Sequence, residues 1–191
     1  MNALSRTGLI LTVLACSVAV SCGKSQTAPS LATVDPATVL FADDFDTENN
    51  RQGVFDWTSF VNWNVLEGCV DLHGNGFVDV QPGKGLYVDL DGSCDDAGTI
   101  ETRSAFTLAP GNYIFEFFLA GNQRINSADT VNVSLGSLLQ ETFVLQQRDR
   151  FELRTRNISV ASQTSVRIRF ENLGGDGRGG LVDLVRLRRA Q

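Results

Sequence analysis

Residues 69–94 read CVDLHGNGFVDVQPGKGLYVDLDGSC, and this stretch decides the fold of the chain. It contains two short strand-like runs, Phe77–Val80 and Leu86–Leu90. Between them Pro82 fixes one φ angle, and the glycines beside it accept positive φ, so a turn is expected there. In the second run apolar and polar side chains alternate, which is the period of a half-buried strand. The stretch therefore predicts two short strands joined by a turn, with a cysteine at each end.

The same period of two continues along the rest of the sequence, with glycine and asparagine turns between the runs. Short alternating strands of this kind predict an all-β fold, a two-sheet antiparallel jelly-roll sandwich over residues 37–189. We expect one face of each sheet to be exposed to solvent, and we expect the arginine-bearing faces to be the exposed ones. Outside residues 69–94 the expected strands centre on Val39–Phe41, Val61–Val65, Tyr113–Leu119, Val131–Leu135, Phe151–Arg156, Val166–Phe170 and Leu181–Leu187.

Charge is unevenly distributed along the 191 residues, whose formal net charge is −6. Residues 22–102 carry three basic and fourteen acidic side chains, whereas residues 103–191 carry twelve arginines and eight acids. The net negative charge disfavours binding to a nucleic-acid phosphate backbone. We interpret the asymmetry as acidic strands pairing with arginine-bearing strands, which favours one register by about 0.2–1 kcal/mol per pair.

The first 21 residues are predicted to be a lipoprotein signal peptide. An apolar run, Leu9–Val20, is too short to span a bilayer and ends in Ala-Val-Ser before Cys22. Small residues before a cysteine resemble the lipobox of bacterial lipoproteins, so Cys22 is the predicted lipid attachment site. Cys16 is a competing candidate, and a plain secretory signal is the alternative. Residues 22–36 are expected to be a flexible tether, which predicts an exported protein anchored by lipid to the cell envelope, at the outer membrane or cell surface.

With Cys22 lipidated, Cys69 and Cys94 are the cysteines left to pair. Exported chains meet an oxidising compartment, where an even pair of cysteines becomes a disulfide. Zinc binding is disfavoured because zinc takes four ligands and His73 is the sole histidine. We therefore predict a structural disulfide between these two cysteines.

A series of short motifs resembles the β-sandwich domain of exported bacterial proteins that carry a PEP-CTERM sorting tail. The resemblance covers nearly all of residues 39–187, and it implies a galactose-binding-like jelly roll in a cell-surface or exopolysaccharide setting, with no particular reaction. The lipobox would take the place of the sorting tail. The motifs are Trp63 with Gly68 and Val70–Leu72, Gly74–Phe77, Tyr87–Ser93, Ala120–Arg124, Val131–Gly136, and Gly174–Asp176 ahead of Leu181–Val185.

Jelly rolls of the carbohydrate-binding type often hold a structural calcium ion between the first and last strands. The matching acidic residues are Asp44 and Asp46 after the first strand and Asp183 in the last. Calcium takes 6–8 oxygen ligands, which suits carboxylates clustered at a strand end. The alternative is that Asp183 faces solvent or pairs with an arginine such as Arg186.

A sugar site needs an exposed aromatic platform and a few polar groups. Trp57 is the candidate platform, although it could equally cap the core. Trp63 and Tyr113 alternate with polar neighbours and are predicted to be core residues. The loop residues Asn122, Gln123 and Arg124 are candidate ligand-binding residues, with a plain turn as the alternative.

Enzymatic function has little support in the sequence. Asp89 and Asp91 share one face of a strand, a spacing that fits cross-strand pairing better than catalysis. A hydrolase triad would need His73, which is expected in a solvated turn and follows no nucleophile-elbow motif. We therefore predict non-catalytic binding of carbohydrate or exopolysaccharide. A structural or adhesive surface protein that recognises another protein is the alternative, and a hydrolase is the third candidate.

Overall fold

The structure of the protein is a computed structural model that describes residues 33–94, 96–124 and 127–191. The predicted signal peptide, most of the tether, Cys16 and Cys22 lie outside the described residues. Within the described part of the chain, no helix is long and apolar enough to cross a membrane.

The described residues fold into β-strands and two short 3-10 helices, with antiparallel pairing throughout. The elements are η1 (Pro36–Thr38), β1 (Val39–Asp43), η2 (Glu48–Arg51), β2 (Trp63–Glu67), β3 (Asp71–Gly74), β4 (Leu86–Asp89), β5 (Thr99–Thr102), β6 (Phe106–Leu108), β7 (Gly111–Ala120), β8 (Asp129–Leu135), β9 (Leu139–Leu145), β10 (Glu152–Val160), β11 (Thr164–Val166), β12 (Ile168–Asn172) and β13 (Leu181–Arg189).

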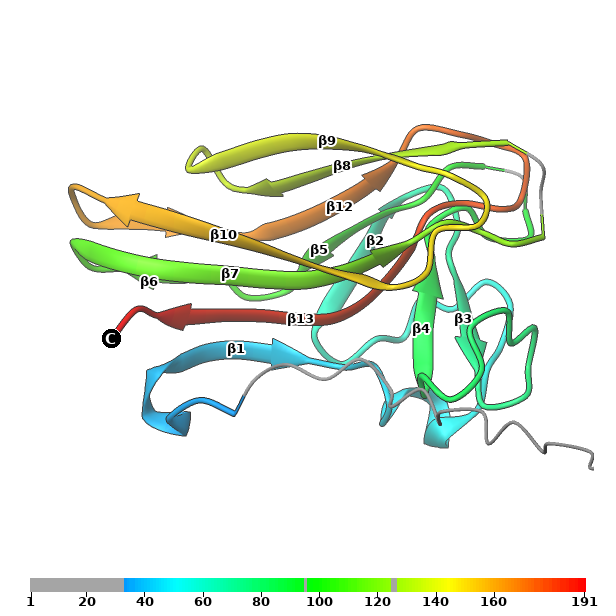
Figure 1. Cartoon of the computed structure of the whole chain (residues 1–191), viewed down its shortest axis with the longest axis horizontal. Coiled ribbons are helices and arrows are strands. Elements are labelled where there is room, and N and C mark those ends of the chain that lie inside the picture. The colour runs from blue at the N-terminus through cyan, green and yellow to red at the C-terminus, as the bar shows by residue number, and fades with distance from the viewer. Residues whose placement is uncertain (1–32, 95, 125–126) are drawn as a thin grey trace, which may run out of the picture.

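Two sheets form the layers of a sandwich (Figure 1). A six-stranded sheet has the order β10-β7-β13-β4-β3, and β1 also pairs with β13. A five-stranded sheet has the order β2-β5-β12-β8-β9, and β6 pairs with β11 separately. The predicted all-β, two-sheet antiparallel sandwich is therefore confirmed.

Aromatic rings join the two layers in the core. Phe170 of β12 contacts Trp63 of β2 and Phe117 of β7, with ring centroids 5.9 and 5.5 Å apart. Trp63 and Tyr113 are buried, as predicted. Burying a side chain of this size stabilises the fold by about 1.5–3 kcal/mol, so the contacts hold the two sheets face to face.

The run Phe77–Val80 is not a strand, contrary to the prediction. A tight turn at Asn75 and Gly76 brings Phe77 back onto Gly74, and the two residues exchange backbone hydrogen bonds of 2.9 Å. Val78 then adopts a positive φ of 42°, which interrupts an extended chain. The prediction for Val61 was also wrong, because β2 begins only at Trp63 and Val61 is 69% exposed.

Two arginines of β10 do not have the solvated position predicted for them. Arg156 lies opposite Phe115, a core residue of β7, so its side chain points to the inner side of the sheet. Because β9 and β10 form the open rim of the sandwich, Arg156 reaches Glu141 of β9, with Nε 2.6 Å from Oε2. Arg154 and Arg156 both lie over the ring of Phe143, 5.6 and 5.5 Å from its centroid. The arginines thus close the rim between the layers.

Cys69 and Cys94 are joined by a disulfide, with their Cα atoms 6.2 Å apart. The bridge ties the segment before β3 to the segment after β4. The predicted pairing is confirmed.

Candidate functional site

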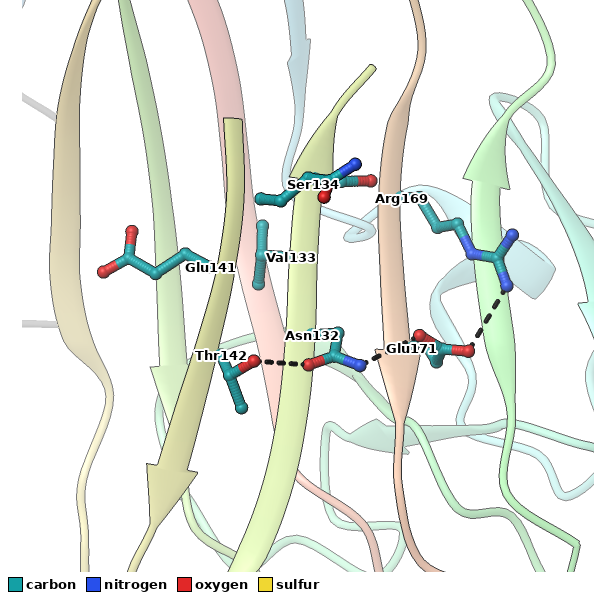
Figure 2. A pocket seen from close by; sticks show the side chains of 8 residues that line it. Asn132, Val133, Ser134, Glu141, Thr142, Arg169 and Glu171 are labelled. Atoms are coloured by element: carbon teal, nitrogen blue, oxygen red, sulfur yellow. Dashed lines mark hydrogen bonds and ion pairs between the residues drawn. The ribbon is translucent and has the colours of Figure 1, made fainter. Parts of the chain in front are cut away.

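A groove of about 490 Å³ crosses the outer face of the five-stranded sheet over β9, β8 and β12 (Figure 2). This volume lies within the range typical of ligand pockets, about 300–1,000 Å³. The groove is lined by Asn132, Val133, Ser134, Gln140, Glu141, Thr142, Arg169 and Glu171.

A row of hydrogen bonds runs across the three strands that carry the groove. Thr142 Oγ1 donates to Asn132 Oδ1 at 2.7 Å, and Asn132 Nδ2 donates to Glu171 Oε2 at 3.0 Å. Arg169 continues the row, with a guanidinium nitrogen 3.4 Å from Glu171 Oε1. Figure 2 shows Thr142, Asn132 and Glu171 in one line, with Arg169 reaching Glu171 from one side of it, whereas Glu141 points away from them. The row fixes the orientation of each polar group before any ligand arrives.

The alternation of β8 places this polar surface outside. Val131, Val133 and Leu135 are buried in the core, so Asn132 and Ser134 face away from it. The sequence already contained this alternation, but it could not show that β9 and β12 flank β8. The groove was therefore missed, because pairing between strands forms it.

The lining of the groove contains no aromatic residue. Trp57, the predicted platform, is half-buried and packs against the core, with its ring centroid 6.3 Å from that of Phe60. The aromatic side chain with large exposure is Phe55, which is 44% exposed and lies 4.8 Å from the ring of Phe77.

Asp89 of β4 contacts the loop Asn122–Arg124 and fixes its position. Asn122 is buried, and its Nδ2 donates to Asp89 Oδ2 at 2.7 Å. The Arg124 backbone N–H donates to Asn122 Oδ1 at 3.2 Å, and Arg124 NH1 lies 3.9 Å from Asp89 Oδ2. The Gln123 carbonyl accepts from Gln147 at 3.5 Å. Asn122 thus fixes the loop, while Gln123 is half-buried and Arg124 is exposed.

His73 is fully buried, contrary to the expectation of a solvated turn. The turn begins only at Asn75, so His73 is a residue of β3 and lies opposite Tyr87 of β4. Its ring nitrogens lie 3.6 Å from an Asp71 oxygen and 3.8 Å from an Asp89 oxygen. Neither nitrogen has a hydrogen-bond partner among the described residues. His73 therefore makes no hydrogen bond to a nucleophile among the described residues.

Asp183 is 1% exposed, and its Oδ2 atom has no hydrogen-bond partner in the described structure. Burial raises its pKa well above the ordinary value, and the negative charges of Asp46 and Asp44 raise it further. The alternative pairing with Arg186 has weaker support, because Arg186 donates to Glu116 at 2.8 Å. The three predicted carboxylates are thus electrostatically coupled.

Local backbone structure positions Asp44 and Asp46 beside β13. The Leu86 N–H donates to Asp46 Oδ1 at 2.7 Å, and the Asp46 N–H donates to Asp44 Oδ1 at 3.1 Å. Gly85 has a φ of +77°, and a Cβ atom there would overlap the Asp46 carboxylate, so glycine is required for this approach. One oxygen of each carboxylate is therefore already used by the backbone.

A metal ion at these residues would need further ligands. Among the described residues, the only three acidic, cysteine or histidine side chains whose ligand atoms all lie within 4.8 Å are Asp56, Cys69 and Cys94, and the two cysteines form the disulfide. Calcium, unlike zinc, accepts backbone carbonyls and water beside one or two carboxylates. Asp44, Asp46 and Asp183 offer only oxygen ligands, which suit calcium better than a closed zinc site, but their ligand atoms do not all lie within 4.8 Å of one another.

No family model and no curated protein matches the chain. Among solved structures it is similar to a cleaved adhesin domain of Lys-gingipain from Porphyromonas gingivalis, with 14% identity, TM-score 0.51, and coverage of 79% of this chain and 98% of that chain. It is also similar to the xylan-binding CBM22 domain from Paenibacillus barcinonensis, with 10% identity, TM-score 0.48, and coverage of 87% and 99%. A third similar structure is a carbohydrate-binding module of Cellvibrio mixtus lichenase 5A, solved with cellotriose, with 11% identity, TM-score 0.41, and coverage of 80% and 99%. At these sequence identities, the similarity to the three structures is one of fold.

Proposed function

We propose that this chain is a non-catalytic carbohydrate-binding domain whose site is the groove over β9, β8 and β12. The observation that carries the proposal is the row Thr142–Asn132–Glu171–Arg169, which offers donors and acceptors side by side. Sugar hydroxyls both donate and accept hydrogen bonds, so a preformed row of this kind suits a polysaccharide segment lying across the strands.

A protein ligand fits the groove less well. The centres of protein interfaces are apolar and rich in aromatic side chains. The groove lining contains a single apolar residue, Val133, and its side chain is buried in the core. Carbohydrate binding is therefore preferred over the adhesive alternative. Binding without aromatic stacking is expected to be weak for each sugar and to gain strength along a polymer.

Affinity electrophoresis and titration calorimetry with soluble polysaccharides test this function, and xylan and β-glucan are the polymers to try first. Asn132→Ala and Glu171→Ala are each expected to weaken binding about tenfold, because a lost polar contact costs about 1–1.5 kcal/mol. Asn157→Ala is the matched control, since Asn157 is exposed on β10 in the other sheet.

Two outcomes would contradict the proposed site. Equal binding by wild type, Asn132→Ala and Glu171→Ala would exclude the groove. If Phe55→Ala abolished binding in that case, the site would lie instead at the exposed Phe55–Phe77 pair. Failure to bind any polysaccharide, together with capture of a purified surface protein, would favour the adhesive alternative.

We also propose that the chain is exported and attached to the bacterial envelope by a lipid at Cys22. The support is the lipobox-like sequence before Cys22, the resemblance to exported PEP-CTERM-associated domains, and the disulfide, which persists in oxidising compartments. Labelled palmitate should enter the wild-type chain and the Cys16→Ser variant but not Cys22→Ser. Labelling of Cys22→Ser would refute this attachment site.

A structural calcium ion beside Asp44, Asp46 and Asp183 is part of the same proposal. The support is the buried, unpartnered Asp183 oxygen and its coupling to the other two carboxylates. The ion would hold the end of β1 against β13. Loss of calcium binding in Asp183→Asn, measured by calorimetry, tests this site.

A further inference from the structure

The segments that follow β4, precede β8 and connect β12 to β13 lie toward the same end of the sandwich (Figure 1). Asp91 follows β4, Asp129 is the first residue of β8, and the segment 174–180 connects β12 to β13. Asp91 is 0% exposed and Asp129 is 7% exposed. Burying two carboxylates together is costly unless a positive charge accompanies them.

The backbone of the glycine-rich segment is built around Asp91. Asp91 Oδ2 accepts hydrogen bonds from the N–H groups of Gly175 at 2.7 Å and Asp176 at 2.9 Å. A Cβ atom at Gly179 would lie 2.5 Å from the Asp91 nitrogen, so the segment approaches Asp91 as closely as glycine permits. The other oxygen, Asp91 Oδ1, is buried without a hydrogen-bond partner in the described structure. Asp129 Oδ2 is likewise buried without a hydrogen-bond partner in the described structure.

The charged groups that act on Asp129 are negative. Burial raises the pKa of Asp129 to about 7, and repulsion from Asp176 and Asp91 adds to the rise. Within the described residues, no ion pair within 4.0 Å joins a basic side chain to Asp91, Asp129 or Asp176. Arg124, which belongs to the same end, lies near Asp89 instead.

We propose that Asp91 and Asp129 hold a divalent cation of the calcium type, separate from the ion proposed beside Asp183. Two buried carboxylate oxygens would be its anchoring ligands, with backbone carbonyls and water completing the hard-oxygen shell that calcium prefers, and the exposed Asp176 would add a negative charge nearby. The ion would fasten β4, β8 and the segment 174–180 to one another. Asp89, the last residue of β4, holds the Asn122–Arg124 loop through Asn122. An ion bound just after β4 would therefore rigidify this loop as well.

The alternative state of Asp129 is a retained proton without a metal, because burial raises its pKa to about 7. A cation would displace that proton. Calcium affinity is therefore expected to increase as the pH rises from 6 to 8, and calorimetry in buffers of different ionisation enthalpy should detect proton release.

Calcium titration of the full chain after chelator treatment tests the proposal. Wild type should bind one more calcium ion than Asp129→Asn at pH 7.5. At about 100 times Kd, calcium should raise the melting temperature of wild type by about 5–10 °C, and Asp129→Asn should lose much of this rise. Asp96→Asn removes an exposed carboxylate and is the matched control, expected to bind as wild type does.

The comparison with Asp183→Asn separates the two cation sites, because each variant should lose one ion and retain the other. Asp129→Asn removes charge repulsion, so in chelator it should melt no lower than wild type. If it melts lower, Asp176→Asn replaces it and should weaken calcium affinity several-fold while leaving melting in chelator unchanged. The proposal is overturned if the variant used binds calcium with the stoichiometry and affinity of wild type. It is also overturned if wild type binds no calcium ion other than the one lost in Asp183→Asn.

Discussion

At the scale of single residues, Asp129 has a pKa of about 7 in the folded protein, against an ordinary value of 3.8. Between about pH 4 and pH 7 the folded state therefore binds a proton that the unfolded state has released. Stability contributed by this proton is present at the acidic end of that window and is lost as the pH rises. Asp89 and Asp183, whose pKa values are also raised by burial, act in the same direction.

We predict that the calcium-free protein melts at a higher temperature at pH 5 than at pH 7.5. Asp129→Asn should flatten part of this dependence, because the amide does not titrate. Thermal denaturation in chelator at a series of pH values measures both effects. Superimposable pH profiles of wild type and Asp129→Asn would show that Asp129 has an ordinary pKa.

The buried polar residues were only partly predictable from the sequence. Asp183 stands in an apolar run, so its need for a partner could be expected. His73 and Asp129 gave no such signal, because their burial depends on what covers them. His73 is covered by the rings of Phe55, Phe77 and Tyr87, which come from three separate segments.

At the scale of elements, the disulfide closes a loop that contains β3 and β4. The loop-entropy description gives about 3 kcal/mol for a loop of this length. Cys69→Ser should therefore lower the melting temperature of the oxidised protein by about 6–12 °C. Wild type treated with a reducing agent should melt close to the variant, and the Cys69→Ser/Cys94→Ser double variant should resemble both. If the variant melts at the same temperature as oxidised wild type, the disulfide contributes little to stability.

Alternation predicted the strand well where one face is buried along its whole length, as in β8. The predicted run Val166–Phe170 also has buried apolar residues, but it is divided between β11, which ends at Val166, and β12, which begins at Ile168. Alternation failed at Phe77–Val80, where the turn chemistry of Asn75 and Gly76 overrides the pattern. It also misplaced Arg154 and Arg156, because period two says which side chains share a face but not which face lies at an open rim. There a long arginine can face inward and still reach a carboxylate.

At the scale of the whole molecule, the sequence was sufficient for the layers but not for the order of strands within them. Alternating side chains require two sheets around a core, whatever the connections. The groove depends on β8 lying between β9 and β12, and the coupling of Asp129 to Asp91 depends on the start of β8 lying near the segment that follows β4. These neighbours are distant in sequence, so no local pattern encodes them.

The placement of β13 affects the order in which the protein can assemble. This strand lies inside the six-stranded sheet, where it pairs with β7, with β4 near its start and with β1 along its second half. A polypeptide that emerges N-terminus first therefore presents β1, β4 and β7 long before their common neighbour is synthesised. Until residue 189 is free, open backbone edges of those strands stay available to foreign strands. Completion of the sheet must accordingly follow synthesis of β13, and the nascent chain is most exposed to aggregation in that interval.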